Sequence, residues 1–238
     1  MKDKIMNNPK VTILCSNYNS SKWIDGYLQS INEQLMECFE IIFVDANSTD
    51  NSLETINGFN FRKGIIKKVL EKNTRIPIYE AWNLAINESE CDYVMNVNTD
   101  DRIFPGSLLT LYHSFLKYKN YDIIYGKNFI CADENHTQIG GLHDWPDHTH
   151  EILLQMSICG PFPMLKKSTI VDNGLFNPEY TISGDYEMWL RLSKRGFIFK
   201  KIDDIIGSYY NNPKGVSTDT SGFQEHVRQD TKLRNMYK

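Results

Sequence analysis

The feature that most restricts the fold is an alternation of short apolar runs with helical patterns over the first hundred residues. The apolar runs are typical of strands and lie at Val11 to Cys15, Ile41 to Val44, Ile65 to Leu70 and Tyr93 to Val97. Between them, helical spacing links Trp23, Leu28 and Ile31, and a second helical pattern follows Pro77 from Ile78 to Ile86. This rhythm predicts βαβ units around a mixed, mainly parallel sheet flanked by helices, an α/β fold.

The second half of the sequence is less regular and predicts a mixture of helices and short strands. Helices are expected at Gly106 to Tyr118, Asp185 to Lys194 and Gly222 to Tyr237, and strands at Ile123 to Tyr125, Pro163 to Leu165, Phe197 to Ile202 and Ile205 to Tyr210. The segment from Gly140 to His150 lacks periodicity, which predicts a loop, and we expect this loop to lie over the ligand-binding site. Because nothing in the chain has the composition of a linker, we expect a single domain over residues 1–238.

Composition excludes several classes of protein. Hydrophobic residues make up 41% and charged residues 24% of the chain, as in ordinary globular proteins, and the net charge of -4 without a long basic run argues against nucleic acid as a partner. The five cysteines form no CxxC pair, so we expect a reducing compartment, the cytoplasm. The polar stretch Met1 to Lys10 predicts no signal peptide. No apolar run has transmembrane length, so we expect no transmembrane segment and at most peripheral membrane contact.

Polar side chains follow the first two predicted strands. Ser16 and Tyr18 come directly after the first strand, where a hydroxyl and an aromatic face can bind a nucleobase, and Asp45 ends the second strand, where it can accept hydrogen bonds from a base or ribose. An alternative is that these residues only form turns and helix caps. Asp50 fits that role better, as the cap of a helix beginning near Asn51.

Two adjacent carboxylates follow the fourth predicted strand, in the sequence Asn98-Thr99-Asp100-Asp101. Hard oxygen ligands in this position suit Mg²⁺ or Mn²⁺ bridging a diphosphate. The alternative is an acidic turn that caps a helix starting near Pro105. The position at the carboxyl end of a buried strand favours the metal site.

A further acid, Asp185, begins the predicted helix that ends at Lys194. Trp189 and Leu192 share the inward face of this helix. We therefore expect Asp185, at the helix start, to face the binding cleft and not the core. The helix N-terminus is expected to lower the pKa of this carboxylate, although Asp185 could equally serve as a first-turn acid that stabilises the helix. Glu187 is the nearest rival, but it points about 200° away around the helix.

These segments together resemble family 2 glycosyltransferases. The resemblance rests on Cys15 to Asn19, Val44 to Asp50, Arg75 to Asn83, Asn98 to Asp101, Gly160 to Met164 and Gly184 to Leu192. It implies a GT-A fold, a nucleoside diphosphate-sugar donor, with a UDP-sugar favoured, and inversion of the anomeric centre. The acceptor is expected to be a saccharide or a lipid-linked molecule, in polysaccharide or glycan assembly.

The resemblance also implies roles for individual residues. Asp185 is the general base, Asp100 is a metal ligand with Asp101 behind it, and Arg75 lines the donor pocket. Asn98 stands where the first acid of the family's DXD element usually lies, and Ala46 replaces a second common acid. By this division, residues from about 10 to 101 bind the nucleotide-sugar and residues from about 102 to 238 bind the acceptor.

Other functions are weaker matches to the sequence. The two replaced acids, at Ala46 and Asn98, allow a catalytically silent module that binds a sugar or nucleotide. A dehydrogenase is disfavoured because no GxGxxG follows the first strand. Histidines and acids crowd the segment from His143 to His150 without the spacing of a standard metal site, and Trp145 there could stack on a sugar ring. His226 is expected to be a surface residue, with a diphosphate contact as the alternative.

Overall fold

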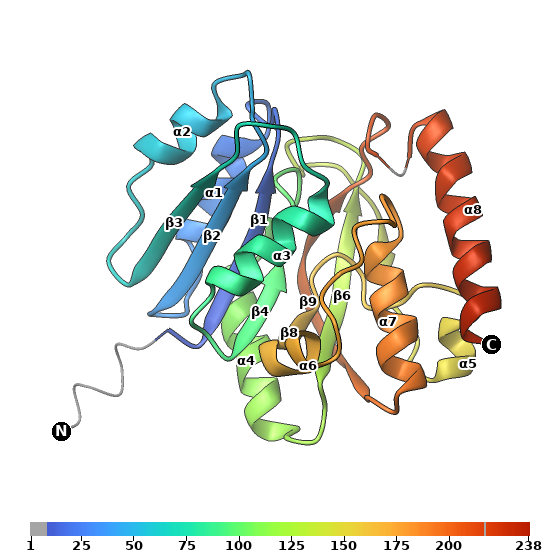
Figure 1. Ribbon diagram of the computed structural model, residues 1–238. Coiled ribbons are helices and arrows are strands. Elements are labelled where there is room, and N and C mark those ends of the chain that lie inside the picture. The colour runs from blue at the N-terminus through green and yellow to red at the C-terminus, as the bar shows by residue number, and fades with distance from the viewer. Residues whose placement is uncertain (1–8, 217) are drawn as a thin grey trace.

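A computed structural model describes residues 9–216 and 218–238 of the chain and shows one nine-stranded sheet between layers of helices (Figure 1). The strands are β1 (Val11–Asn17), β2 (Phe39–Asp45), β3 (Ile65–Glu71), β4 (Tyr93–Asn96), β5 (Arg102–Ile103), β6 (Ile123–Cys131), β7 (Ile139–His143), β8 (Met164–Lys166) and β9 (Phe199–Tyr210). They lie in the order β3-β2-β1-β4-β8-β6-β9-β5, and β7 pairs with β6. The α/β fold and the mixed, mainly parallel sheet expected from the sequence are confirmed.

Helices cover both faces of this sheet. They are α1 (Ile24–Asn32), α2 (Ser52–Gly58), α3 (Ile78–Glu88), α4 (Ser107–Lys117), α5 (His150–Leu153), α6 (Lys167–Asp172), α7 (Gly184–Lys194) and α8 (Thr220–Tyr237). One apolar core joins the sheet to α3, α6 and α7, and a second core joins its other face to α1 and α4. The last helix, α8, lies along the outer side of α7 (Figure 1).

The pleat of the central strand explains why there are two cores. Successive side chains of a strand point to opposite faces, so Ile13 and Cys15 of β1 enter the core beneath α1, while Leu14 enters the core beneath α3. Strands that are covered on both faces read as continuous apolar runs. This is the reason that the parallel half of the sheet could be recognised from the sequence.

The central strand β1 also fixes where ligands can bind. β2 and β3 follow β1 on one side of it, whereas β4 pairs with its other side, and all four strands run parallel. The order therefore reverses between β1 and β4. In such sheets the loops at the carboxyl ends of the strands separate at this point and leave a crevice.

The second half of the chain departs from the expected elements. β9 is one continuous strand where two were expected, since it bends at register shifts against β6 instead of breaking. The segment expected as a loop from Gly140 to His150 contains most of β7 and the first residue of α5. The short elements β5 and α6 were not expected.

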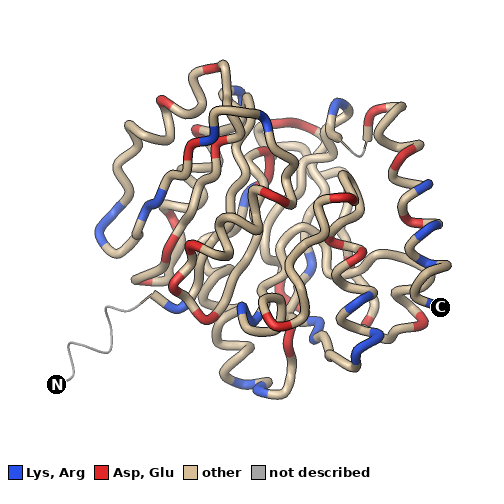
Figure 2. Tube along the Cα trace, viewed as in Figure 1, with Lys and Arg blue, Asp and Glu red and all other residues tan. Residues whose placement is uncertain are grey.

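Three expectations from the sequence concern a transmembrane segment, the charge distribution and a signal peptide. No helix within residues 9–216 and 218–238 is long and apolar enough to cross a membrane. Figure 2 shows acidic and basic residues interspersed along the trace, without a long stretch of one sign. The interpretation of Met1 to Lys10 as lacking a signal peptide concerns mainly residues 1–8, which lie outside the described residues, and it stays a prediction.

Candidate active site at the carboxyl ends of the strands

The ends of β1 and β2 are joined by a buried network of side-chain hydrogen bonds. Asn17 Nδ2 donates to Asp45 Oδ1 at 2.6 Å, and both residues are almost fully buried. Ser48 donates to the same carboxylate through its backbone N–H at 2.9 Å and through its hydroxyl at 2.6 Å. The oxygens of Asp45 thus hold the turn after β2. This geometry favours a role in shaping the pocket over the direct base or ribose contact expected from the sequence.

Tyr18 and Arg75 meet above this network. Tyr18 is 39% exposed beyond the end of β1, and the Arg75 guanidinium lies 4.4 Å from the centre of its ring. Arg75 is itself exposed, in the loop between β3 and α3. The sequence indicated these two residues separately, and the structure brings them together as a cation–π pair beyond the carboxyl end of β1. Ser16 lies lower, partly buried within β1.

The acidic pair after β4 occupies two different environments. Asp101 is fully buried, and its Oδ1 accepts the backbone N–H of Tyr210 at 3.0 Å from the end of β9. No residue in the described ranges bonds to its other oxygen, Oδ2. Asp100 is partly buried, and its Oδ2 lies 3.4 Å from Asn212 Nδ2. Neither acid caps α4, whose first turn has no side-chain cap.

Burial raises the pKa of both carboxyl groups, and the negative charge of Asp100 raises the pKa of Asp101 further. The adjacent Arg102 guanidinium compensates only in part, because its N–H groups donate to the backbone carbonyls of Thr99, Asp101 and Trp23. Two neighbouring carboxyl groups in this state gain from a cation. Asp100 is the more exposed of the two acids.

Two residues that the sequence did not indicate, His136 and Asn212, contact Asp100. The His136 ring bonds to the backbone oxygen of Asp100 at 2.8 Å through Nε2 and to the Ser208 hydroxyl at 2.6 Å through Nδ1. Burial lowers the pKa of His136, which favours the neutral ring. No sequence motif marks His136 or Asn212, because they reach the acids only through the pairing of β6 with β9.

Asp185, at the start of α7, is held by one oxygen and open at the other. The Tyr79 hydroxyl donates to Asp185 Oδ1 at 3.0 Å, and the N–H of Tyr186 donates to the same oxygen at 2.8 Å. Among the described residues, none donates to Asp185 Oδ2, and the side chain is only partly buried. The open oxygen is therefore available to a substrate hydroxyl.

The expected direction of the Asp185 pKa shift is wrong. Burial raises the pKa of Asp185, and this effect outweighs the hydrogen bonds from Tyr186 and Tyr79, which lower it. On α8, His226 lowers the pKa and Asp230 raises it. A carboxylate with a raised pKa is a stronger base than an exposed one.

Glu187, the rival acid, is committed to packing. It is 4% exposed, and both of its oxygens accept hydrogen bonds from Arg191, at 2.9 and 3.0 Å. The Tyr237 hydroxyl donates to Glu187 Oε1 at 2.6 Å from the end of α8. Trp189 and Leu192 face the core, as expected. Of the two acids in the first turn of α7, only Asp185 presents an open oxygen.

The histidine-rich segment from His143 to His150 packs against other parts of the protein. His148 stacks on Phe199 with ring centres 4.0 Å apart, and burial lowers the pKa of His148 to about 4. His143 and Trp145 lie against each other at 4.5 Å. Across residues 9–216 and 218–238, no group of three or more His, Cys, Asp or Glu side chains could hold a metal ion.

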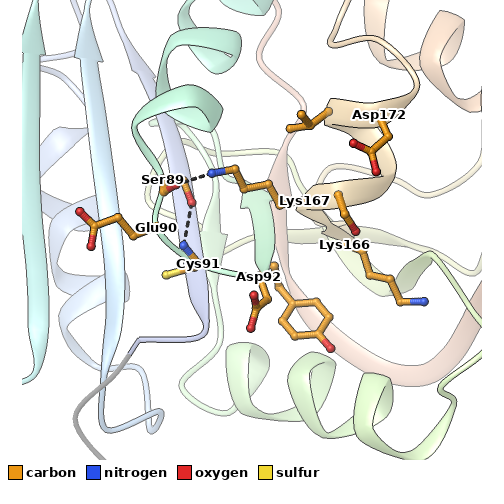
Figure 3. A pocket seen from close by; sticks show the side chains of 10 residues that line it. Ser89, Glu90, Cys91, Asp92, Lys166, Lys167 and Asp172 are labelled. Carbon is orange, nitrogen blue, oxygen red and sulfur yellow. Dashed lines mark hydrogen bonds between the residues drawn. The ribbon is translucent and has the colours of Figure 1, made fainter.

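An open pocket of about 560 Å³ lies at the opposite edge of the sheet, between the start of β4 and α6 (Figure 3). Its two lysines are already paired, since Lys167 donates to the backbone oxygen of Ser89 and Lys166 contacts Asp122 at 3.4 Å. It contains none of the residues that converge beyond β1, β2 and β4. The crevice at the carboxyl ends is the better candidate site.

Comparison with known proteins identifies the family of the chain. The sequence profile described as "Glycosyl transferase family 2" matches residues 12–165, well over half of the chain. The chain belongs to glycosyl transferase family 2. As a family 2 glycosyltransferase it is 27% identical to a chondroitin synthase of Escherichia coli over 197 residues, and 27% identical to a hyaluronan synthase of Pasteurella multocida over 218 residues. These alignments cover 83% and 91% of this chain but only 28% and 22% of those relatives.

Solved structures share the fold of this family 2 glycosyltransferase. The S. aureus TarS fragment 1–349 in complex with UDP-GlcNAc matches with a TM-score of 0.73 at 20% identity, over 94% of this chain and 66% of that one. A mannosyltransferase from Pyrobaculum calidifontis, in complex with GDP-Man and Mn²⁺, matches with a TM-score of 0.68 at 15% identity, over 93% of this chain and 65% of that one. At these identities the likeness establishes the GT-A fold.

Proposed function

We propose that this family 2 glycosyltransferase transfers a sugar from a UDP-sugar to an acceptor hydroxyl with inversion of the anomeric centre. The observation that carries the proposal is Asp185, whose Oδ1 is fixed by two donors, one of them Tyr79 of α3, and whose Oδ2 is open. An inverting displacement needs a base on the acceptor side, opposite the leaving nucleotide. The TarS structure with UDP-GlcNAc supports a UDP-sugar as donor.

Each side of the crevice then has a defined task. The Tyr18 ring with the Arg75 guanidinium binds the base and diphosphate of the donor, over a turn that Asp45 holds and beside Ser16 in β1. On the other side, Asp185 Oδ2 takes the proton of the acceptor hydroxyl. The hydroxyl oxygen then forms its bond to the anomeric carbon as the bond from that carbon to the diphosphate breaks. Glu187 cannot replace it, because Arg191 and Tyr237 occupy its carboxylate.

The residues after β4 fit a divalent cation. Asp100 would hold it, with Asp101 behind and the Asn98 amide beside the donor sugar. Burial raises the pKa of both acids, which supports a cation as their counter-charge. Mg²⁺ and Mn²⁺ favour such oxygen ligands together with substrate phosphates. When bound, the ion neutralises the charge that develops on the departing diphosphate. The Mn²⁺ in the mannosyltransferase structure supports this assignment.

The acceptor is proposed to be a saccharide or a lipid-linked molecule, since the chondroitin and hyaluronan synthases among the relatives are named for polysaccharides. Four free, buried thiols, Cys15, Cys91, Cys131 and Cys159, support a reducing location such as the cytoplasm. Membrane contact, if the acceptor is lipid-linked, would then be peripheral.

The test is the release of nucleoside diphosphate from a panel of UDP- and GDP-sugars with Mn²⁺, in the presence of oligosaccharide and polyprenyl-phosphate-linked sugar acceptors. Release of UDP above the rate without acceptor, with an inverted product anomer by NMR, is the expected result. Binding of UDP without turnover on any donor would identify a silent binding module instead. A retained anomer would refute the role of Asp185.

A further inference from the structure

Tyr79 connects the donor side of the crevice to the acid at the start of α7. It lies in the first turn of α3, four residues after Arg75, and is 4% exposed. Its hydroxyl donates to the backbone oxygen of Ile182 at 2.6 Å and to Asp185 Oδ1 at 3.0 Å. One hydroxyl proton thus lies between a fixed carbonyl and a carboxylate that changes charge.

The Tyr79 ring is held tightly enough to aim this hydroxyl. It packs against Trp82 and Phe176 with ring centres 5.3 and 5.7 Å away. Its edge lies against the first residue of α7, where a Cβ on Gly184 would come within 2.7 Å of two ring carbons. Glycine at position 184 is therefore required for the ring to lie this close to the helix start, which brings the hydroxyl to Asp185.

Asp185 has few other partners that could orient it. Tyr186 contributes a backbone N–H from the same helix. Cys159, in the loop before β8, and His226 and Asp230, on α8, interact with it through charge alone. Tyr79 is the one side chain among the described residues that donates a hydrogen bond to this carboxylate. A hydrogen bond from a neutral donor to a carboxylate stabilises the ionised form over the protonated form.

We propose that Tyr79 is a positioning residue that fixes Asp185 Oδ1 and thereby turns Oδ2 toward the acceptor hydroxyl. The inference rests on the proposed role of Asp185 as the base. In the ionised state the Tyr79 proton is shared with Oδ1. Once Oδ2 has taken the acceptor proton, the carboxyl is neutral and the Tyr79 hydroxyl keeps its bond to the Ile182 carbonyl. Tyr79 touches no reacting atom and acts only through Asp185.

The first test needs no substrate. The carboxyl ¹³C resonance of Asp185, assigned by its loss in Asp185→Asn, is titrated in the wild-type protein, in Tyr79→Phe and in Tyr180→Phe. Tyr180 is a matched control, because it is a buried tyrosine near the same site whose hydroxyl makes no hydrogen bond to the described residues. The titration midpoint should rise in Tyr79→Phe and stay at the wild-type value in Tyr180→Phe. An unchanged midpoint in Tyr79→Phe would overturn the proposal, whatever the activity.

The second test uses the donor that the panel identifies. Tyr79→Phe should lower kcat by about tenfold, the size expected for one hydrogen bond to a charged group. The acidic limb of its pH profile should move to higher pH, while UDP affinity by calorimetry stays unchanged. Gly184→Ala, which keeps the hydroxyl but displaces the ring, should change kcat in the same direction. A loss of UDP affinity as large as the loss of kcat would refute a positioning role. Absence of turnover in the wild-type protein would refute the proposed function and leave the NMR result standing.

Discussion

The clearest stability prediction concerns Glu187, the buried acid that the sequence offered as a rival base. The change Glu187→Gln removes a negative charge that is 4% exposed and that receives two hydrogen bonds from Arg191. Arg191 also donates to the carbonyls of Asn173, Gly174 and Leu175, so this charge pair joins α7 to the preceding loop. The substitution leaves the partly buried Arg191 cation without its counter-charge.

The size of the effect follows from this geometry. Removing one partner of a buried ion pair costs about 3–5 kcal/mol, and we take the lower value because glutamine keeps one acceptor oxygen and Arg191 keeps three carbonyls. In a domain of this size each kcal/mol lowers Tm by about 2–4 °C, so Tm should fall by about 6–12 °C. At a temperature where both proteins are folded, kcat should remain at the wild-type value. Differential scanning calorimetry and the UDP-release assay measure the two quantities.

The control is Glu225→Gln on α8. Glu225 also forms a two-bond pair with an arginine, Arg228, at 2.6 Å for each bond, but this pair lies at the surface, where solvent screens it. Its Tm should barely change. If Glu187→Gln kept the wild-type Tm, the structural role of Glu187 would be refuted. A loss of kcat in a stable Glu187→Gln protein would reinstate Glu187 as the candidate general base.

Three further predictions address the crevice. Asp185→Asn should lower kcat by roughly 10²- to 10⁴-fold without weakening UDP binding, and a wild-type kcat in this variant would exclude Asp185 as the base. Because burial raises the pKa of Asp185, the activity of the wild-type protein should be lost as the pH falls through a value above the pKa of an exposed aspartate. Asp100→Ala should abolish the activation by Mn²⁺, as EDTA does in the wild-type protein, and full turnover in excess EDTA would exclude the metal. Tyr18→Ala and Arg75→Ala should each raise the donor KM by more than they lower kcat, and unchanged UDP affinity in both by calorimetry would place the base pocket elsewhere.

The parallel half of the fold could be predicted because its strands β1 and β2 are buried on both faces. Val11 to Cys15 and Ile41 to Val44 are continuous apolar runs, and the loops after them are polar, which locates both the strands and the crevice. The other half was harder for a physical reason. β9 carries exposed Asp203 and Asp204 at its centre, so its sequence has the pattern of two strands with a turn between them.

Most contacts of the site join residues far apart in sequence, and no local pattern encodes them. Asp101 bonds to the backbone of Tyr210, and Tyr79 bonds to Asp185 more than a hundred positions later. The sequence indicated Asp185 through its position at a helix start, but the sign of its pKa shift depends on burial beneath neighbouring elements. Local electrostatics alone could not have supplied that sign.

The single sheet has a consequence for how the crevice can close. Strands β1, β2 and β4 and strands β6, β8 and β9 are hydrogen-bonded into one continuous layer. Rotation of one half against the other about a hinge would break the pairing of β4 with β8. Substrate enclosure must therefore come from local movement of surface segments such as residues 72–77 and 211–216, and its rate should depend on their backbone freedom and not on the stability of the sheet.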